Sequence, residues 1–175
     1  MGVTADTPVN IVIGAGDVYL DDQLIGATMA NNAFRVIRTL FTPDLNGVPG
    51  PLEGTDYIQS ETAEMECTIP ELSADILEVL LPNSDVATSG GDKIVSSSGV
   101  RRISSDSYRE VELRVPGLDN LEFRFRLHRA LVTGPVVFEA ADDGVLAPRI
   151  IWQGRWEAGD NSASPWEILR LLAGS

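Results

Sequence analysis

Apolar and polar residues alternate along much of the chain, and this period of two predicts β-strands. The clearest case is segment 62–69, in which four apolar residues alternate with four polar ones. The apolar positions are Ala63, Met65, Cys67 and Ile69, and the polar positions are Thr62, Glu64, Glu66 and Thr68. Successive side chains of a strand point to opposite faces, so the segment predicts a strand with one buried face and one face that carries carboxylates.

The second half of the chain repeats this pattern in two neighbouring segments. Residues 111–115 and 121–127 alternate, and a turn sequence containing Pro116 and Gly117 separates them. Two alternating runs around such a turn predict a β-hairpin. Its polar positions are Glu110, Glu112, Arg114, Glu122, Arg124, Arg126 and His128. We therefore expect a mixed face of acidic and basic side chains.

Further strands are expected at residues 10–13, 18–20, 24–29, 34–41, 136–140, 146–156 and 164–168, with a weak edge strand at 93–98. Residues 83–91 are polar and predict a loop, and the Asp-Gly pair at 143–144 predicts a turn. On the strand at 146–156, Leu146, Ile150, Trp152 and Trp156 share one face. We expect the three tryptophans, at positions 152, 156 and 166, to lie in the core.

Only residues 70–81 have helical periodicity. Leu72, Ile76, Leu77 and Leu80 form one stripe, and Pro82 follows the segment. The spacing of Thr68 and Glu71 is that of a capping box. One helix is too few for an alternating α/β fold. The sequence thus predicts a single mainly β domain over residues 1–175, an antiparallel β-sandwich or barrel with one short helix packed against it.

A long loop precedes the strand at 62–69. Residues 42–56 contain three prolines and three glycines, more than a hairpin turn requires. Loops of this length in a compact domain are usually functional or disordered.

The chain is acidic, with a net charge of −13, and the charge is uneven. Residues 1–90 contain 14 Asp/Glu and 2 Lys/Arg, whereas residues 91–175 contain 12 and 11. Such a protein is not expected to bind nucleic acid by neutralising phosphates. No apolar run is long enough to cross a bilayer, and the first ten residues lack the pattern of a signal peptide. We therefore expect no membrane association and a cytoplasmic place of synthesis.

The sequence offers few candidates for catalysis or cofactor binding. A single cysteine, Cys67, and a single histidine, His128, do not supply a zinc site, and no cofactor is expected. Gly14 and Gly16 follow a strand, but β-forming residues come next instead of a helix, which argues against a dinucleotide site. Glu64 and Glu66 share a strand face at roughly 7 Å, a spacing open to acid/base catalysis. A solvated acidic face is the simpler interpretation.

The chain resembles the major tail tube proteins of long-tailed, non-contractile bacteriophages over nearly its full length. The resemblance lies in the opening segment NIVIGAGDVYLDDQLIGAT and in the order of the elements that follow. These are a strand, the long loop with Pro49-Gly50-Pro51-Leu52-Glu53-Gly54-Thr55, the alternating strand, the ELSADILEVLLP helix, the late strand at 145–156 and Pro165-Trp166-Glu167-Ile168. A carboxy-terminal immunoglobulin-like domain, which some members carry, is not recognisable.

The resemblance implies a structural virion protein without enzymatic activity. Copies would close into six-fold rings that stack into a tube, assembled in the host cytoplasm, through which DNA passes without specific binding. Other partners would be the tape measure, tail terminator and distal tail proteins. The long loop would reach a neighbouring subunit or ring through Leu45, Val48, Leu52 and Tyr57. A flexible exposed loop is the alternative.

We expect the channel face to include ten positions. They are Thr62, Glu64, Glu66, Thr68, Glu110, Glu112, Arg114, Glu122, Arg124 and Arg126. Their mixed signs leave two interpretations, Glu/Arg ladders between adjacent strands or a bore less acidic than the net charge suggests.

Other functions remain open from the sequence. A tail terminator or completion protein would form rings on the same kind of fold. A protein of another class would be a monomeric β-sandwich binding module, suggested by the tryptophans, or a carboxylate-dependent hydrolase that uses Glu64 and Glu66.

Overall fold

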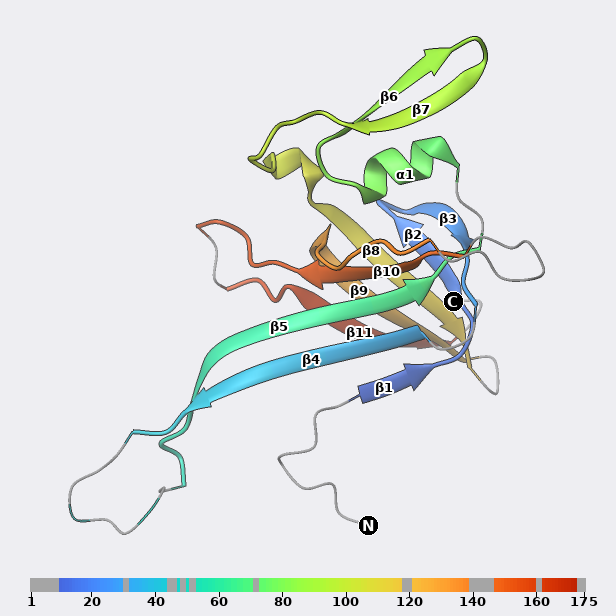
Figure 1. The fold of residues 1–175 in the computed structure, drawn as a ribbon. Coiled ribbons are helices and arrows are strands. Elements are labelled where there is room, and N and C mark those ends of the chain that lie inside the picture. Colours follow the sequence, from blue (N-terminus) through green and yellow to red (C-terminus); the bar gives the residue numbers. More distant parts are fainter. Residues whose placement is uncertain are drawn as a thin grey trace.

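Antiparallel β-strands dominate the computed structural model, which describes residues 10–29, 32–43, 47, 50, 53–70, 73–117, 121–138, 147–159 and 162–172. The arrangement is sandwich-like and not a closed barrel, with one short α-helix (Figure 1). The first strands are β1 (Asn10–Ile13), β2 (Asp17–Leu20), β3 (Gln23–Ala27), β4 (Asn32–Phe41) and β5 (Tyr57–Thr68). After α1 (Ala74–Leu80) come β6 (Ser84–Ser89), β7 (Asp92–Ser97), a 3-10 turn (Ser105–Ser107), β8 (Arg109–Pro116), β9 (Leu121–Val132), β10 (Arg149–Gly154) and β11 (Trp166–Leu172).

Strand β9 joins the two layers of the sandwich. The strands follow the order β1-β4-β5-β10-β9-β8-β2-β3, and β11 also pairs with β9. One edge of β9 pairs with β8, while its other edge pairs first with β11 at residues 121–127 and then with β10 at residues 130–132. The sheet therefore turns at β9, which places β1, β4, β5 and β10 in one layer and β11, β9, β8, β2 and β3 in the other (Figure 1).

The apolar faces of both layers form one core. Ala63, Met65 and Cys67 are buried on β5, as the alternation predicts. The ring of Phe34 lies 5.5 Å from that of Phe125 in the opposite layer and 6.1 Å from that of Trp166. Burial, and to a lesser degree the charge of Glu66, raise the pKa of the Cys67 thiol above its ordinary value, so this thiol stays protonated and unreactive.

The helix is shorter than its sequence pattern and has a different cap. It begins at Ala74 after the N-cap Ser73, whose hydroxyl accepts a hydrogen bond from the Ile76 amide at 3.2 Å. The predicted cap at Thr68 is wrong, because Thr68 is still part of β5, where it pairs with Arg149. The pairing of β5 with β10 thus keeps Thr68 in the strand, and the helix begins after Ser73.

Two strand predictions also need correction. The polar segment 83–91 is not a loop but contains β6, which forms a hairpin with β7 that packs beside α1. Its two-residue turn consists of Gly90 and Gly91, both with positive φ, as such hairpins require. In segment 136–138 only a single bridge, between Val137 and Arg149, is formed. The Asp-Gly turn at 143–144 and Leu146 lie outside the described residues.

The tryptophans do not share one environment. Trp152 is buried and Trp166 packs against the core. Trp156 lies beyond the end of β10 and is 43% exposed, so its expected core position is wrong. Its indole Nε1 donates to the Glu61 carbonyl at 3.5 Å.

Candidate functional site

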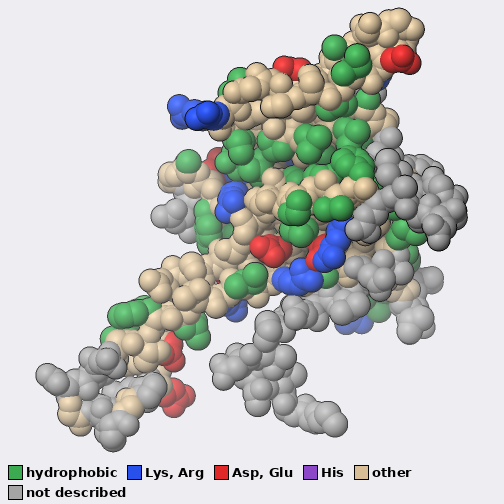
Figure 2. Space-filling model, in the orientation of Figure 1, with side chains coloured by type: hydrophobic (Ala, Val, Ile, Leu, Met, Phe, Trp, Pro, Cys, Tyr) green, Lys and Arg blue, Asp and Glu red, His purple; other side chains and the backbone are tan. Residues whose placement is uncertain are grey.

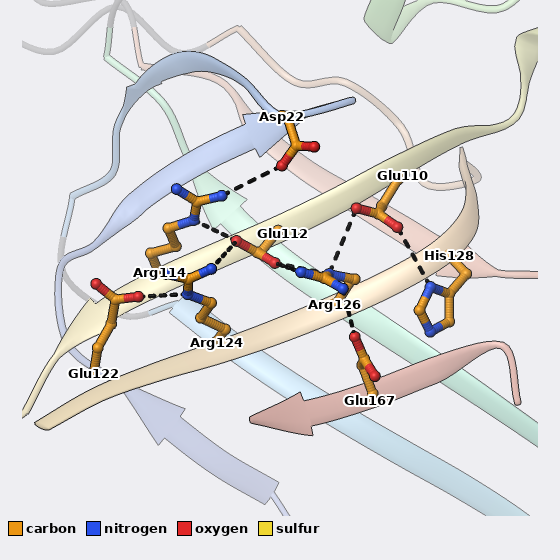
Figure 3. Close-up of polar contacts among 9 residues, drawn as sticks. All are labelled: Asp22, Glu110, Glu112, Arg114, Glu122, Arg124, Arg126, His128 and Glu167. Carbon is orange, nitrogen blue, oxygen red and sulfur yellow. Dashed lines mark hydrogen bonds and ion pairs between the residues drawn. The ribbon is translucent and has the colours of Figure 1, made fainter. Parts of the chain in front are cut away.

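A connected set of ion pairs covers the outer face of β8, β9 and β11, and we call it the Glu112 network (Figure 3). Glu112, only 3% exposed, lies at its centre. Its Oε2 accepts a hydrogen bond from Arg126 Nε at 2.7 Å, and its Oε1 accepts one from Arg114 Nε. Arg126 also binds Glu167 on β11 at 2.6 Å, so the network crosses three strands.

Further pairs extend the network toward both ends of the face. Arg124 Nε donates to Glu122 Oε1 at 2.5 Å. Arg114 Nη2 lies 3.5 Å from Asp22 Oδ1, and its guanidinium stacks 3.7 Å above the ring centroid of Tyr19 on β2. The pair of Arg126 with Glu112 matches the predicted Glu/Arg ladder between adjacent strands, whereas the pairs of Arg114 and Arg124 with Glu112 and Glu122 lie within one strand.

The guanidinium groups determine the ionisation of Glu112. Burial alone would raise its pKa, but hydrogen bonds from Arg114 and Arg126 outweigh that effect and hold the pKa below its ordinary value. The same contacts raise the pKa of Arg114 and Arg126 despite the opposing effect of burial. All three groups are therefore charged at neutral pH.

Carboxylates outnumber guanidiniums in the network. Its acids are Asp22, Glu110, Glu112, Glu122 and Glu167, and its arginines are Arg114, Arg124 and Arg126. His128 lies at its margin, with Nδ1 3.4 Å from Glu110 Oε2, and its side chain is 37% exposed, as expected for a surface residue. The face consequently carries a small excess of negative charge spread over paired side chains.

A second, smaller charged cluster lies on the outer face of β5. Glu66 is 7% exposed and binds Arg35 Nη1 on β4 at 2.8 Å and Arg149 on β10. Glu64 Oε1 accepts a hydrogen bond from Gln153 Nε2 at 3.2 Å. Both oxygens of Glu66 are thus engaged by arginines. That arrangement serves strand pairing better than proton transfer to a substrate.

The ten candidate channel positions divide between two faces. Those at 62, 64, 66 and 68 lie on the outer face of β5, whereas the other six lie on the outer face of β8 and β9. In the view onto the Glu112 network, β4 and β5 lie behind β8 and β9 (Figure 3). The two sets therefore point away from each other. A channel wall formed by one face of the subunit can contain only one of the two sets.

The paired glycines near the amino terminus take part in a buried clasp. The Thr28 hydroxyl donates to the Gly16 carbonyl at 2.9 Å and accepts from the Gly16 amide at 3.0 Å. Asn32, fully buried, donates from Nδ2 to the Gly14 carbonyl at 2.8 Å and to Thr28 Oγ1 at 2.6 Å. The clasp fixes the turn between β1 and β2, a role that the sequence pattern did not reveal.

The outer halves of β4 and β5 project from the sandwich as a two-stranded ribbon, here called the arm (residues 37–41 and 57–62; Figure 1). In the described residues β1 pairs with β4 only at 32–35, and β10 pairs with β5 only at 64–68. Among the described residues, no third strand therefore pairs with the arm. Isolated hairpins of this kind are marginally stable in water.

The arm exposes large apolar side chains. Its exposed residues are Ile37 (49%), Leu40 (57%), Phe41 (53%), Tyr57 (64%) and Ile58 (56%). Figure 2 shows hydrophobic side chains along this ribbon up to its end. Grouped exposed apolar residues usually mark an interaction surface. Tyr57 is thus exposed on the arm, while Leu45, Val48 and Leu52 lie outside the described residues.

Glu61 anchors the base of the arm. Its carboxylate accepts a hydrogen bond from Trp166 Nε1 at 2.9 Å and binds Arg38 across the ribbon. The connection to Trp166 links the base of the ribbon to β11 in the opposite layer.

Comparisons with protein-family models and with curated proteins each find no match to the chain. Among the described residues, no group of three His, Cys, Asp or Glu side chains is placed to hold a metal ion. No helix in the described part of the chain has the length and apolarity to span a membrane. Among the described residues, the features that bear on function are the arm and the charged faces of β5 and of β8, β9 and β11.

Proposed function

We propose that the chain is a structural virion protein, a major tail tube subunit of a long-tailed, non-contractile bacteriophage. Copies form hexameric rings, and the rings stack into a tube that conducts the genome into the host. Its partners are other copies of itself and the tape measure, terminator and distal tail proteins. The main observation in favour of the proposal is the arm, a two-stranded ribbon whose exposed apolar side chains are typical of a protein-interaction surface.

The open strand edges support the same proposal. In the described residues, β1 and β3 end the strand order, and β11 pairs with β9 alone. Exposed edges are sites of pairing with other chains, and closure into a ring removes them. A sandwich with open edges and a projecting arm is well suited to repeated assembly.

The Glu112 network is the better candidate for the channel wall. Its excess of carboxylates over guanidiniums repels the DNA backbone weakly, and the mutual ion pairs leave few free cations to bind phosphate. The face of β5, by contrast, continues into the arm, which other subunits would cover. A density map with Glu112 on the outer surface of the tube would contradict this assignment.

Negative-stain electron microscopy, together with size-exclusion chromatography and light scattering, tests the proposal. Hollow rings or tubes with six-fold end views are expected from the purified chain. Assemblies that stop at a single ring would favour a terminator instead. A chain that stays monomeric at high concentration, in every salt and with a tail initiator complex added, would overturn the proposal.

A further inference from the structure

The connection between β7 and β8 contains an irregular, exposed stretch, residues 98–104, which we call the dibasic segment. It runs out to the side of the molecule before the chain turns back into β8 (Figure 1). Two adjacent arginines, Arg101 and Arg102, lie in its middle, and both are exposed. The flanking Val100 is 58% exposed and Ile103 is 36% exposed. Exposed irregular segments of this kind are preferred sites of proteolytic cleavage.

The backbone distinguishes these two arginines from the other cations of the chain. Every lysine and arginine lies in the described residues, and all except Arg101, Arg102 and Arg155 belong to strands. Hydrogen bonds between strands hold the backbone, so a strand does not readily enter the binding cleft of a protease. Arg155 lies outside the strands, but its amide donates to the Arg129 carbonyl at 2.8 Å and continues the pairing of β10 with β9. The dibasic segment is therefore the basic site with the least constrained backbone.

The side chains of the two arginines are also open to recognition. Arginines of the strands commonly form ion pairs, as Arg109 does with Asp21 at 3.0 Å. Among the described residues, neither Arg101 nor Arg102 has an acidic partner. An endopeptidase specific for basic residues binds its substrate cation through a carboxylate in the specificity pocket. An arginine without a partner enters such a pocket without first breaking an ion pair.

Asn83, which follows α1, holds the dibasic segment against the body. Its Nδ2 donates to the Val100 carbonyl at 2.9 Å and to the Arg102 carbonyl at 3.3 Å. Its own carbonyl accepts a hydrogen bond from the Ser98 amide at 2.9 Å. The backbone of Asn83 has a φ of 60°, a conformation that asparagine adopts more readily than most residues. Because the two side-chain bonds are exposed to solvent, we expect them to open locally without unfolding of the sandwich.

We propose that the dibasic segment is a processing site for an arginine-specific endopeptidase. The reaction is hydrolysis of the peptide bond after Arg101 or Arg102. Water supplies the hydroxyl of the new arginine carboxyl group and a proton for the amine of the following residue. The inference does not depend on the proposed tube.

The two fragments are expected to stay together after the cut. Strand β2 lies before the cut and pairs with β8 after it, and β5 pairs with β10 in the same way. The ring contact between Phe34 and Phe125, at 5.5 Å, also joins the two fragments. Cleavage therefore breaks the chain between β7 and β8 and leaves both layers in place.

Limited digestion of the full chain with trypsin tests the site. The first products should be two fragments whose new ends lie within residues 101–103, as mass spectrometry identifies them. The fragments should elute together in size-exclusion chromatography, at the volume of the uncut chain. The variant Arg101→Gln/Arg102→Gln should lose this first cut while its circular dichroism stays unchanged. A first cut at any other lysine or arginine, Arg155 included, or separation of the fragments without denaturant, overturns the proposal.

Asn83→Gly tests whether the side-chain amide restrains the segment. Glycine tolerates the positive φ but lacks the donor, so the backbone conformation is kept and two hydrogen bonds are lost. The cut should become about fivefold faster or more, because cleavage follows the population of the opened segment.

The matched control adds Arg101→Gln/Arg102→Gln to Asn83→Gly. Cleavage elsewhere in this triple variant should stay as slow as in Arg101→Gln/Arg102→Gln, which shows that the opening is local. An unchanged rate in Asn83→Gly, or rapid digestion of the triple variant, would contradict the restraint by Asn83.

Discussion

Glu112 shows how one buried carboxylate organises a surface of strands. It lies on β8, binds Arg114 on the same strand and Arg126 on β9, and is almost inaccessible to solvent. Removing one partner from such a cluster leaves buried charges uncompensated. The ion pairs of this face therefore depend on Glu112 more than on any exposed acid.

Replacement Glu112→Gln should lower the free energy of unfolding at neutral pH by about 1–3 kcal/mol, because two arginines lose their anionic partner. The pKa of Glu112 is lowered in the folded state, so its stabilisation is full above the ordinary carboxyl value and is lost as pH falls through the lower folded value. Urea unfolding over this acidic range should show that the free energy of unfolding falls less steeply with decreasing pH in Glu112→Gln than in the unmodified chain. Glu122→Gln, at a pair whose side chains are each 28% exposed, is the control, with an effect below about 1 kcal/mol. Identical acid dependence in Glu112→Gln and the unmodified chain would refute the assignment.

Gly16 illustrates a residue required by close backbone approach. A Cβ at this position would lie 2.4 Å from the Arg114 carbonyl oxygen, which cannot move aside without shifting β8. Gly16→Ala should therefore destabilise the fold by about 1–3 kcal/mol or more. Gly14→Ala, where a Cβ meets nothing within 4 Å, should have a much smaller effect. Thermal unfolding of both variants measures the difference, and equal melting temperatures would disprove it.

At the level of elements, α1 is short and depends on its ends. Its seven residues provide few internal hydrogen bonds, so the Ser73 cap contributes a large share of its stability. Because Ile76 and Val79 line a cavity of about 430 Å³ beside β3, fraying of the helix also disturbs that surface.

Replacement Ser73→Ala should cost about 1 kcal/mol, because the Ile76 amide loses its acceptor, whereas Ser73→Asp should retain the cap. Hydrogen exchange of the α1 amides is the appropriate measurement, with faster exchange expected in the alanine variant only. Thr68→Val provides a comparison, since its hydroxyl does not cap the helix. Faster α1 exchange in Thr68→Val than in Ser73→Ala would restore the sequence-based cap.

The strands with strong alternation of apolar and polar residues were predictable from the sequence. The other features depend on contacts between strands, which the alternation does not specify. The core face of β5 and the β8–β9 hairpin followed from period-two alternation. Strand β6 could not be predicted in this way, because a hairpin that packs only beside α1 needs few apolar residues. The Gly90-Gly91 turn is the only strong indication of this hairpin in the sequence. The division of the charged positions between two faces was also hidden, because it arises from the double pairing of β9.

At the scale of the whole molecule, the net charge of −13 opposes association of identical copies. Salt screens this repulsion, since the Debye length falls from about 30 Å at 0.01 M to about 10 Å at 0.1 M ionic strength. The apolar contacts of the arm are not weakened by such screening. Charge and burial therefore act in opposite directions on assembly.

We expect assemblies to be more abundant at about 0.15 M than at about 0.01 M ionic strength, as measured by light scattering and electron microscopy. Sodium and magnesium chloride at matched ionic strength distinguish screening from specific ion binding. Assemblies equally stable in very low salt and in physiological buffer would count against this expectation.

The double pairing of β9 also bears on when the chain can fold during synthesis. Strand β5 has its partner β10 far downstream, with Thr68 opposite Arg149, and β9 needs β11 at residues 166–172. While the ribosome holds the residues after β5, only β2 and β3 of the opposite layer are present to cover its apolar face. Long-range strand pairing of this kind is slow and leaves aggregation-prone apolar surfaces exposed. Folding of the sandwich should accordingly wait until β11 has left the ribosome, so that subunits become competent for assembly only after residues 166–172 have been exposed.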